Sequence, residues 1–145
     1  MENYIENHNE NAETVCGYTV YSYYIDRLCV RIKKICPNAK VIFATSTSVL
    51  SEKMSPDFKR YNEEIEAYNA AAVKVVSEYG FQVNDLYTTS VLLPAEAHSD
   101  AVHYYTPMGT KIFTEQVLSY LIPTLGIDEK MEYIEKLYTD KPIGI

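Results

Sequence analysis

An aspartate and a histidine three positions apart, Asp100 and His103, are the residues of this sequence best suited to acid–base chemistry. In a tight turn this spacing brings the carboxylate to Nδ1 of the imidazole and leaves Nε2 free to accept a proton. The pair therefore has the composition of a general base with the residue that orients it. A two-residue motif also arises by chance, so the spacing alone is weak evidence for catalysis.

A general base needs a nucleophile, and the sequence offers only weak candidates for one. Ser46 and Ser48 follow an apolar stretch, but their neighbours lack the glycines of a nucleophile elbow. The three cysteines, Cys16, Cys29 and Cys36, are odd in number and lack paired spacing, which argues against a disulfide framework or a structural zinc site. We therefore expect free buried thiols, and neither a metal nor a cofactor.

Three further polar residues lie near the motif or at the end of a predicted strand. His98 either supports the pair from nearby or is an ordinary loop histidine. Asn84 and Asp85 end the second predicted strand, and Asp85 is expected to cap the following turn instead of acting in catalysis. The fourteen tyrosines suit helix packing, with a sugar-stacking surface as the alternative.

Length and composition indicate one ordinary globular domain over residues 1–145, with 1–13 as a polar tail. A net charge of -7 argues against nucleic acid or anionic lipid as a partner. The start of the chain lacks the apolar core of a signal peptide, and no run of about 18 apolar residues occurs. We therefore expect a cytoplasmic protein that does not bind membranes.

Hydrophobic spacing predicts a strand, a long helix and a second strand in the middle of the chain. Residues 40–45 are apolar without polar alternation, as in a parallel strand covered on both faces. A long helix over 58–79 ends at Gly80, and a second short strand ends at Asn84 and Asp85. The inner face of that helix is predicted to carry Phe58, Tyr61, Ile65, Tyr68, Ala72, Val75 and Tyr79.

Helices are also predicted before and after this unit. The first, over 18–35, is predicted to bury Tyr18, Tyr21, Ile25, Leu28, Ile32 and Ile35. Residues 88–103 are expected to be mostly loop, with room for a helical turn, before a helix that Thr106 caps and Pro107 begins. The inner face of that helix is predicted to carry Gly109, Ile112, Phe113, Val117, Tyr120 and Leu121. A short final helix, capped by Asp128, is predicted to turn Met131, Ile134 and Leu137 inward.

A sheet of only two strands is physically unfavourable here, because an apolar parallel strand normally lies inside a sheet with a neighbouring strand on each side. A two-stranded parallel sheet is also a poor independent unit. The sequence therefore predicts that another strand pairs there or that the domain is incomplete.

Three stretches of the chain resemble the C-terminal portion of the SGNH (GDSL-type) hydrolase family. "CPNAKVIFATSTSV" is similar to its fourth strand, and "RYNEEIEAYNAAAVKVVSEYGFQVNDLY" to its long helix and fifth strand. "HSDAVHYYTPMGTKIFTEQVLSYL" is similar to its Asp–His loop and final helix. The resemblance covers about residues 18–121.

This resemblance implies an α/β fold of the three-layer α/β/α flavodoxin-like type, here incomplete, with about two parallel strands and three to four helices. It also implies hydrolysis of acyl esters, often acetyl groups on carbohydrate, by a serine nucleophile without a metal. His103 would be the general base and then the acid, and Asp100 its orienter. The family's serine lies in an upstream G-D-S block, and its oxyanion donors lie in two following blocks; this sequence contains no G-D-S.

Two functional hypotheses follow. The chain is the C-terminal portion of an SGNH-type esterase, with an acyl ester or carbohydrate substrate, and is inactive in isolation without its nucleophile block. Alternatively it is a non-catalytic α/β module, or a truncated gene product, that completes its sheet by oligomerising through the unpaired edge.

Overall fold

The structure of this chain is a computed structural model that describes residues 17–57 and 60–126. Several sequence predictions lie outside these residues. They are the polar tail over 1–13, the thiol of Cys16, the burial of Phe58, and the final helix with Asp128, Met131, Ile134 and Leu137.

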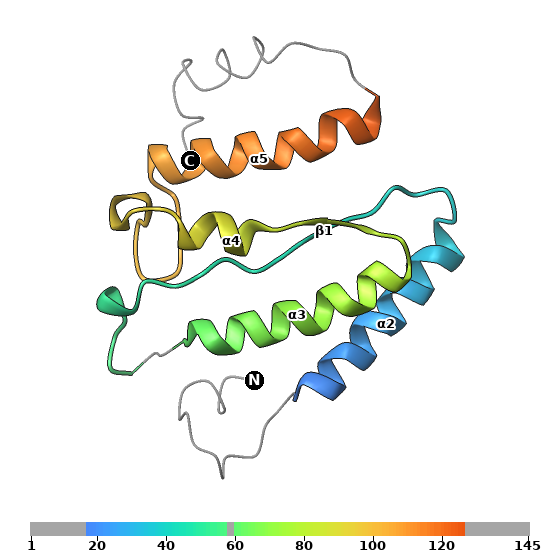
Figure 1. Ribbon diagram of the computed structural model, residues 1–145, viewed down its shortest axis with the longest axis horizontal. Coiled ribbons are helices and arrows are strands. Elements are labelled where there is room, and N and C mark those ends of the chain that lie inside the picture. Colours follow the sequence, from blue (N-terminus) through green and yellow to red (C-terminus); the bar gives the residue numbers. More distant parts are fainter. Residues whose placement is uncertain (1–16, 58–59, 127–145) are drawn as a thin grey trace, which may run out of the picture.

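The described residues form an α/β fold with four α-helices and a two-stranded parallel sheet. The elements in chain order are α2 (Tyr18–Ile35), β1 (Ile42–Ala44), η1 (Ser51–Lys53), α3 (Asn62–Glu78), β2 (Gln82–Asn84), α4 (Leu86–Val91), η2 (Ala95–Ala97) and α5 (Pro107–Leu125). Ile42 pairs with Gln82 and Ala44 with Asn84, so the predicted strand–helix–strand unit is confirmed. The prediction of a strand over 40–45 that is covered on both faces was wrong: β1 has three residues, of which Ile42 and Phe43 are half-buried and Ala44 is exposed, because β2 is its only strand neighbour among the described residues. Figure 1 shows the strands between α5 on one side and α3 with α2 on the other.

The core beneath α2 and α3 centres on Cys29, Val76 and Phe81. Ile25 and Ile32 of α2 pack against this cluster, together with apolar side chains of both strands. Phe81 follows Gly80, whose φ of +67° lies in the left-handed region that glycine adopts without strain. This glycine ends the long helix at the position predicted from the sequence.

The predicted inner faces of the first two helices are partly wrong. In α2, Tyr18, Leu28 and Ile35 are 41%, 55% and 61% exposed, and the deeply buried position is Cys29. In α3, Val76 is buried in place of Val75, and the helix begins at Asn62 instead of residue 58. Helical spacing defines a stripe only to within one residue, and the position of the neighbouring elements decides which side chain is covered.

After β2 the chain is more helical than predicted. α4 begins at Leu86, where a strand end and a loop were expected, because Asp85 supplies an N-cap that starts a helix at once. Thr106 caps α5 and Pro107 occupies its first turn, as predicted. On the predicted inner face of α5, Leu121 is exposed, whereas Gly109 is buried. Ile112, Phe113, Val117 and Tyr120 are half-buried.

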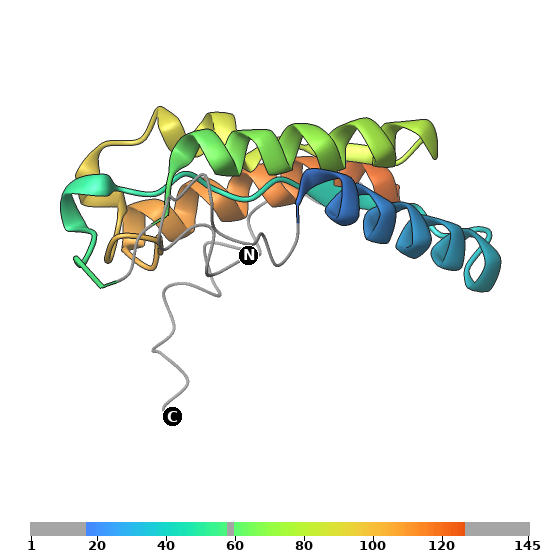
Figure 2. The same ribbon diagram turned by 90° about the horizontal axis from the view of Figure 1, so that it is seen from below.

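Both edges of the sheet lack a strand partner within residues 17–57 and 60–126. β1 pairs with β2 alone, and seven large apolar side chains of α2 are exposed. Figure 2, turned by 90°, shows α2 at the end of the molecule, packed beside α3 with its other side uncovered by any described element. None of the helices described is long and apolar enough to cross a membrane.

Candidate catalytic site

The loop between η2 and α5 carries Asp100 and His103, and Tyr104 fixes its position. Tyr104 is buried, and its hydroxyl donates to the backbone oxygen of Ser48 and contacts the Ser48 hydroxyl, both at 3.0 Å. A backbone bond of 2.8 Å from Leu50 N to Ala101 O joins the same two segments. The loop is therefore held at the carboxyl end of β1, where ligands bind in open α/β sheets.

The first turn of α5 holds the other end of the loop. The Thr106 hydroxyl donates to Ala97 O at 2.8 Å and accepts from Gly109 N at 3.1 Å. A Cβ on Gly109 would lie 2.6 Å from the backbone oxygens of both Ala97 and Tyr104. Only glycine therefore allows α5 to approach the loop this closely. The sequence pattern placed Gly109 on the inner face but missed both this close approach and the anchoring role of Tyr104.

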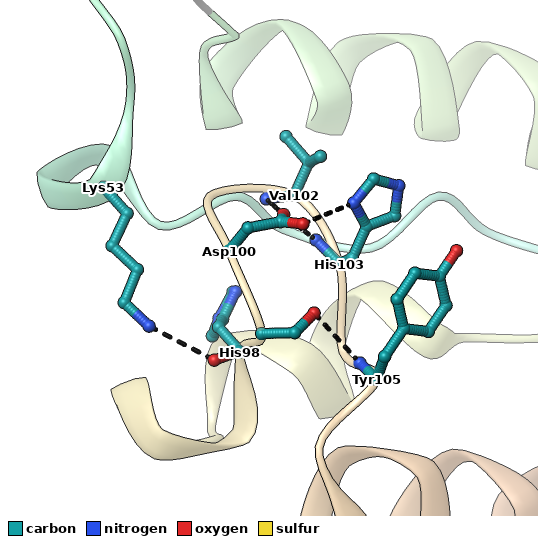
Figure 3. A network of polar contacts seen from close by, with 7 residues as sticks. Lys53, His98, Asp100, Val102, His103 and Tyr105 are labelled. Carbon is teal, nitrogen blue, oxygen red and sulfur yellow. Dashed lines mark hydrogen bonds and ion pairs between the residues drawn. The ribbon is translucent and has the colours of Figure 1, made fainter.

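Asp100 and His103 form the contact that their spacing predicts. His103 Nδ1 lies 2.8 Å from Asp100 Oδ2, and Asp100 Oδ1 accepts the backbone N–H groups of Val102 and His103, each at 2.8 Å (Figure 3). The Val102 N–H, the imidazole and the His103 N–H lower the pKa of Asp100 to about 2. The ionised carboxylate can only accept, so Nδ1 carries the proton between them.

The second nitrogen of His103 is available to a molecule arriving from solvent. The side chains of His103 and Asp100 are 48% and 53% exposed, and Figure 3 shows the other ring nitrogen directed away from Asp100. With Nδ1 protonated, a neutral imidazole presents Nε2 as a proton acceptor. The pair therefore has the geometry of an oriented general base, open on its reactive side.

Among the residues that the structure describes, no hydroxyl or thiol hydrogen-bonds His103. Ser48 is buried, its hydroxyl contacts Tyr104, and its backbone N–H donates to Ser90 Oγ at 2.8 Å. The backbone of Ser46 is held on both sides by the Asn69 amide at 2.9 Å. Neither serine is arranged as a nucleophile for this base.

The two described cysteines are both free, but only one is buried. Burial raises the pKa of the Cys29 thiol, the opposite of what a nucleophilic thiolate needs. Cys36 is exposed, which corrects the expectation of a buried thiol. It follows the last residue of α2, beyond the stretch that packs on the core.

His98 packs beneath the loop and forms no hydrogen bond with Asp100 or His103. Its ring lies 4.0 Å from that of Tyr104 (centroid to centroid), and its Nδ1 is buried without a hydrogen-bond partner. Burial, with a smaller effect of Lys53, lowers the pKa of His98. Lys53 Nζ donates to the His98 backbone oxygen at 3.2 Å, which ties η1 to the loop (Figure 3). His98 therefore supports the loop through packing.

Asp85 and Asn84, at the end of β2, have structural partners. Asp85 accepts from the Thr88 hydroxyl at 2.6 Å and the Thr88 backbone N–H at 3.1 Å, and the hydroxyl contributes most to lowering its pKa. The predicted capping role of Asp85 is thus confirmed. Asn84 is buried, and its side-chain oxygen accepts from Gln116 at 2.8 Å.

The described residues contain no group of three or more His, Cys, Asp or Glu side chains that could hold a metal ion. The chain matches no protein-family model and no curated protein.

Proposed function

We propose that His103 is the general base, and Asp100 its orienter, of a serine-type acyl-ester hydrolase of the SGNH kind, whose nucleophile comes from outside the described residues. One observation carries the proposal: an ionised carboxylate, fixed by two backbone N–H groups, holds Nδ1 of a half-exposed imidazole. The position of the pair just before α5, and its similarity to the family's closing block, agree with this role.

The chemistry follows from the two ring nitrogens. His103 Nε2 takes the proton of a serine hydroxyl as its oxygen bonds to the ester carbonyl carbon. Asp100 stabilises the imidazolium that forms. The imidazolium then returns the proton to the leaving alkoxide, which departs as an alcohol. A water molecule, activated by the same nitrogen, releases the acid and regenerates the serine.

The substrate class comes from the resemblance, which points to small acyl esters such as acetyl groups on carbohydrate. The half-exposed pair lies on the surface of the described residues, so an ester bound to an accompanying nucleophile-bearing segment could reach it. The same resemblance supports a flavodoxin-like arrangement for the complete sheet, of which β1 and β2 are two strands.

A graft tests the pair in a complete site. Residues 98–111 replace the Asp–His block of an active SGNH esterase, and turnover of p-nitrophenyl acetate is measured. We expect activity within about tenfold of the parent, and a loss of about a thousandfold when the grafted His103 is changed to alanine. A folded graft whose activity does not depend on His103 would overturn the proposed role.

A second candidate function is a non-catalytic module that pairs with another chain. The unpaired side of β1 and the exposed apolar side chains of α2 favour it. Two results together would favour this module over the esterase. Substitutions in α2 would abolish self-association, and the activity of the graft would not depend on His103.

A further inference from the structure

Tyr105 has little packing role of its own, because 76% of its surface is exposed. Its ring nevertheless lies against the imidazole of His103, with the ring centroids 4.9 Å apart and 15° between the ring planes. Near-parallel rings at this separation attract each other. An aromatic side chain therefore covers one face of the proposed base.

The hydrogen bond to Asp100 is a weak restraint by itself. Both side chains are about half exposed, and water competes for an exposed charged contact of this kind. Rotation of the imidazole about its bond to Cβ would carry Nδ1 away from the carboxylate. A contact on the ring face opposes partial rotation, because a partly turned ring would no longer lie parallel to Tyr105. A half-turn restores the parallel planes, and the hydrogen bond to Asp100 opposes it, because it would place Cδ2 instead of Nδ1 at the carboxylate.

Ser99 links the backbone of Tyr105 to the backbone of His103. Its backbone N–H donates to Ser99 Oγ at 3.2 Å, and Ser99 N–H donates to the backbone oxygen of His103 at 2.9 Å. Figure 3 shows Tyr105 on the side of His103 away from Asp100. The next residue, Thr106, caps α5, so the backbone of Tyr105 is fixed on both sides.

We propose that Tyr105 is a positioning residue for His103. Its ring holds the imidazole in the plane in which Nδ1 meets Asp100 and Nε2 faces outward, and its electron-rich face favours the imidazolium that forms during proton transfer. The inference rests on the proposed role of His103 as a base. The orientation and tautomer of the ring are nevertheless measurable without any activity.

The test uses the full chain with ¹⁵N-labelled histidine and two-bond ¹H–¹⁵N correlation spectra at alkaline pH. These spectra report which ring nitrogen carries the proton. We expect the Nδ1–H tautomer to predominate in the wild type and in Tyr105→Phe. In Tyr105→Ala its ratio to the other tautomer should fall about threefold. Tyr105→Leu, which keeps bulk but has no π face, should resemble the alanine variant.

Tyr23→Ala is the matched control, because Tyr23 is also an exposed tyrosine paired with a neighbouring ring, but lies on α2. It should leave the His103 signals unchanged. A Tyr105→Ala ratio equal to wild type, or no rescue by Tyr105→Phe, would overturn the positioning role. Absence of an Nδ1–H preference in the wild type would instead count against Asp100 as orienter, and so against the proposed function.

Discussion

The polar groups of the Asp–His loop have hydrogen-bond partners, whereas apolar side chains on the outer side of α2 are left exposed. In the loop, the Tyr104 hydroxyl, the Thr106 hydroxyl and the Asp100 carboxylate all have hydrogen-bond partners, in η2, in the loop itself or in the segment that follows β1. On α2, Tyr24 and Leu28 are exposed, and the adjacent strand pairs on one side only. Monomeric proteins rarely expose contiguous apolar surface of this kind.

The described residues include every segment that holds the proposed base in place, whereas they include no strand that could cover the edges of the sheet. The loop depends on Ser48 and Leu50 after β1, on η2 and on α5, all of which lie within the described residues. The pair is therefore expected to keep its geometry even where the sheet lacks a neighbour.

The largest expected effect comes from removing the anchor of the loop. Tyr104→Ala deletes a buried ring and should lower the free energy of unfolding by about 3–4 kcal/mol, measured by urea denaturation. Tyr104→Phe keeps the ring and loses only the contact with Ser48, so it should cost about 1 kcal/mol. Equal effects of the two variants would show that packing of the ring does not secure the loop.

The close approach of α5 gives the next largest effect. Gly109→Ala places a methyl group 2.6 Å from two backbone oxygens and should lower the free energy of unfolding by about 2 kcal/mol. Thr110→Ala, one position along the same helix, is the control and should change it by less than about 0.5 kcal/mol. Alanine is intrinsically the better helix former, so a stabilised Gly109→Ala would mean that the loop is not packed this closely.

The exposed apolar side chains of α2 give the next effect. We expect the wild-type chain to self-associate or to bind a dye specific for apolar surface, measured by sedimentation velocity and 1-anilinonaphthalene-8-sulfonate fluorescence. Leu28→Glu should reduce both signals and change the free energy of unfolding by only about 0.5 kcal/mol, because the side chain is exposed. Arg27→Gln, on the same helix, also makes the net charge more negative by one unit and controls for charge. If the wild-type chain is a monomer and binds no dye, α2 does not expose an apolar surface that differs from the well-packed loop.

The smallest expected effect is the pH dependence that Asp100 contributes. Its pKa of about 2 in the folded chain lies below the value of about 3.9 expected for an unfolded aspartate. The carboxylate therefore contributes stability that is present above about pH 4 and is lost as the pH falls toward 2. The difference in Tm between the wild type and Asp100→Asn should shrink over this range. A difference that stays constant with pH would contradict the depressed pKa.

Features that depend on residues close together in the sequence were predicted correctly. Thr106 before Pro107 marks the start of α5, Asp85 caps α4, and the spacing of Asp100 and His103 predicts their contact. Each depends on residues within a few positions of one another, so local backbone geometry determines the outcome.

Features that depend on distant partners were missed. The contact of Tyr104 with Ser48 joins residues 56 positions apart, and no periodicity marks either of them. The choice of Cys29 over Leu28 as the buried position of α2 depends on where α3 and the strands lie. Tyr105 stacks on His103 from two positions away, but an exposed tyrosine in a loop carries no pattern that indicates such a contact.

We propose that this chain carries an oriented base in His103, and that none of its described residues acts as the nucleophile. The most direct measurement compares hydrolysis of p-nitrophenyl acetate by the purified chain and by its His103→Ala variant, at equal concentration and confirmed folding. We predict equal rates and no serine labelled by a fluorophosphonate. Robust turnover that disappears in His103→Ala, together with a labelled serine, would contradict the claim.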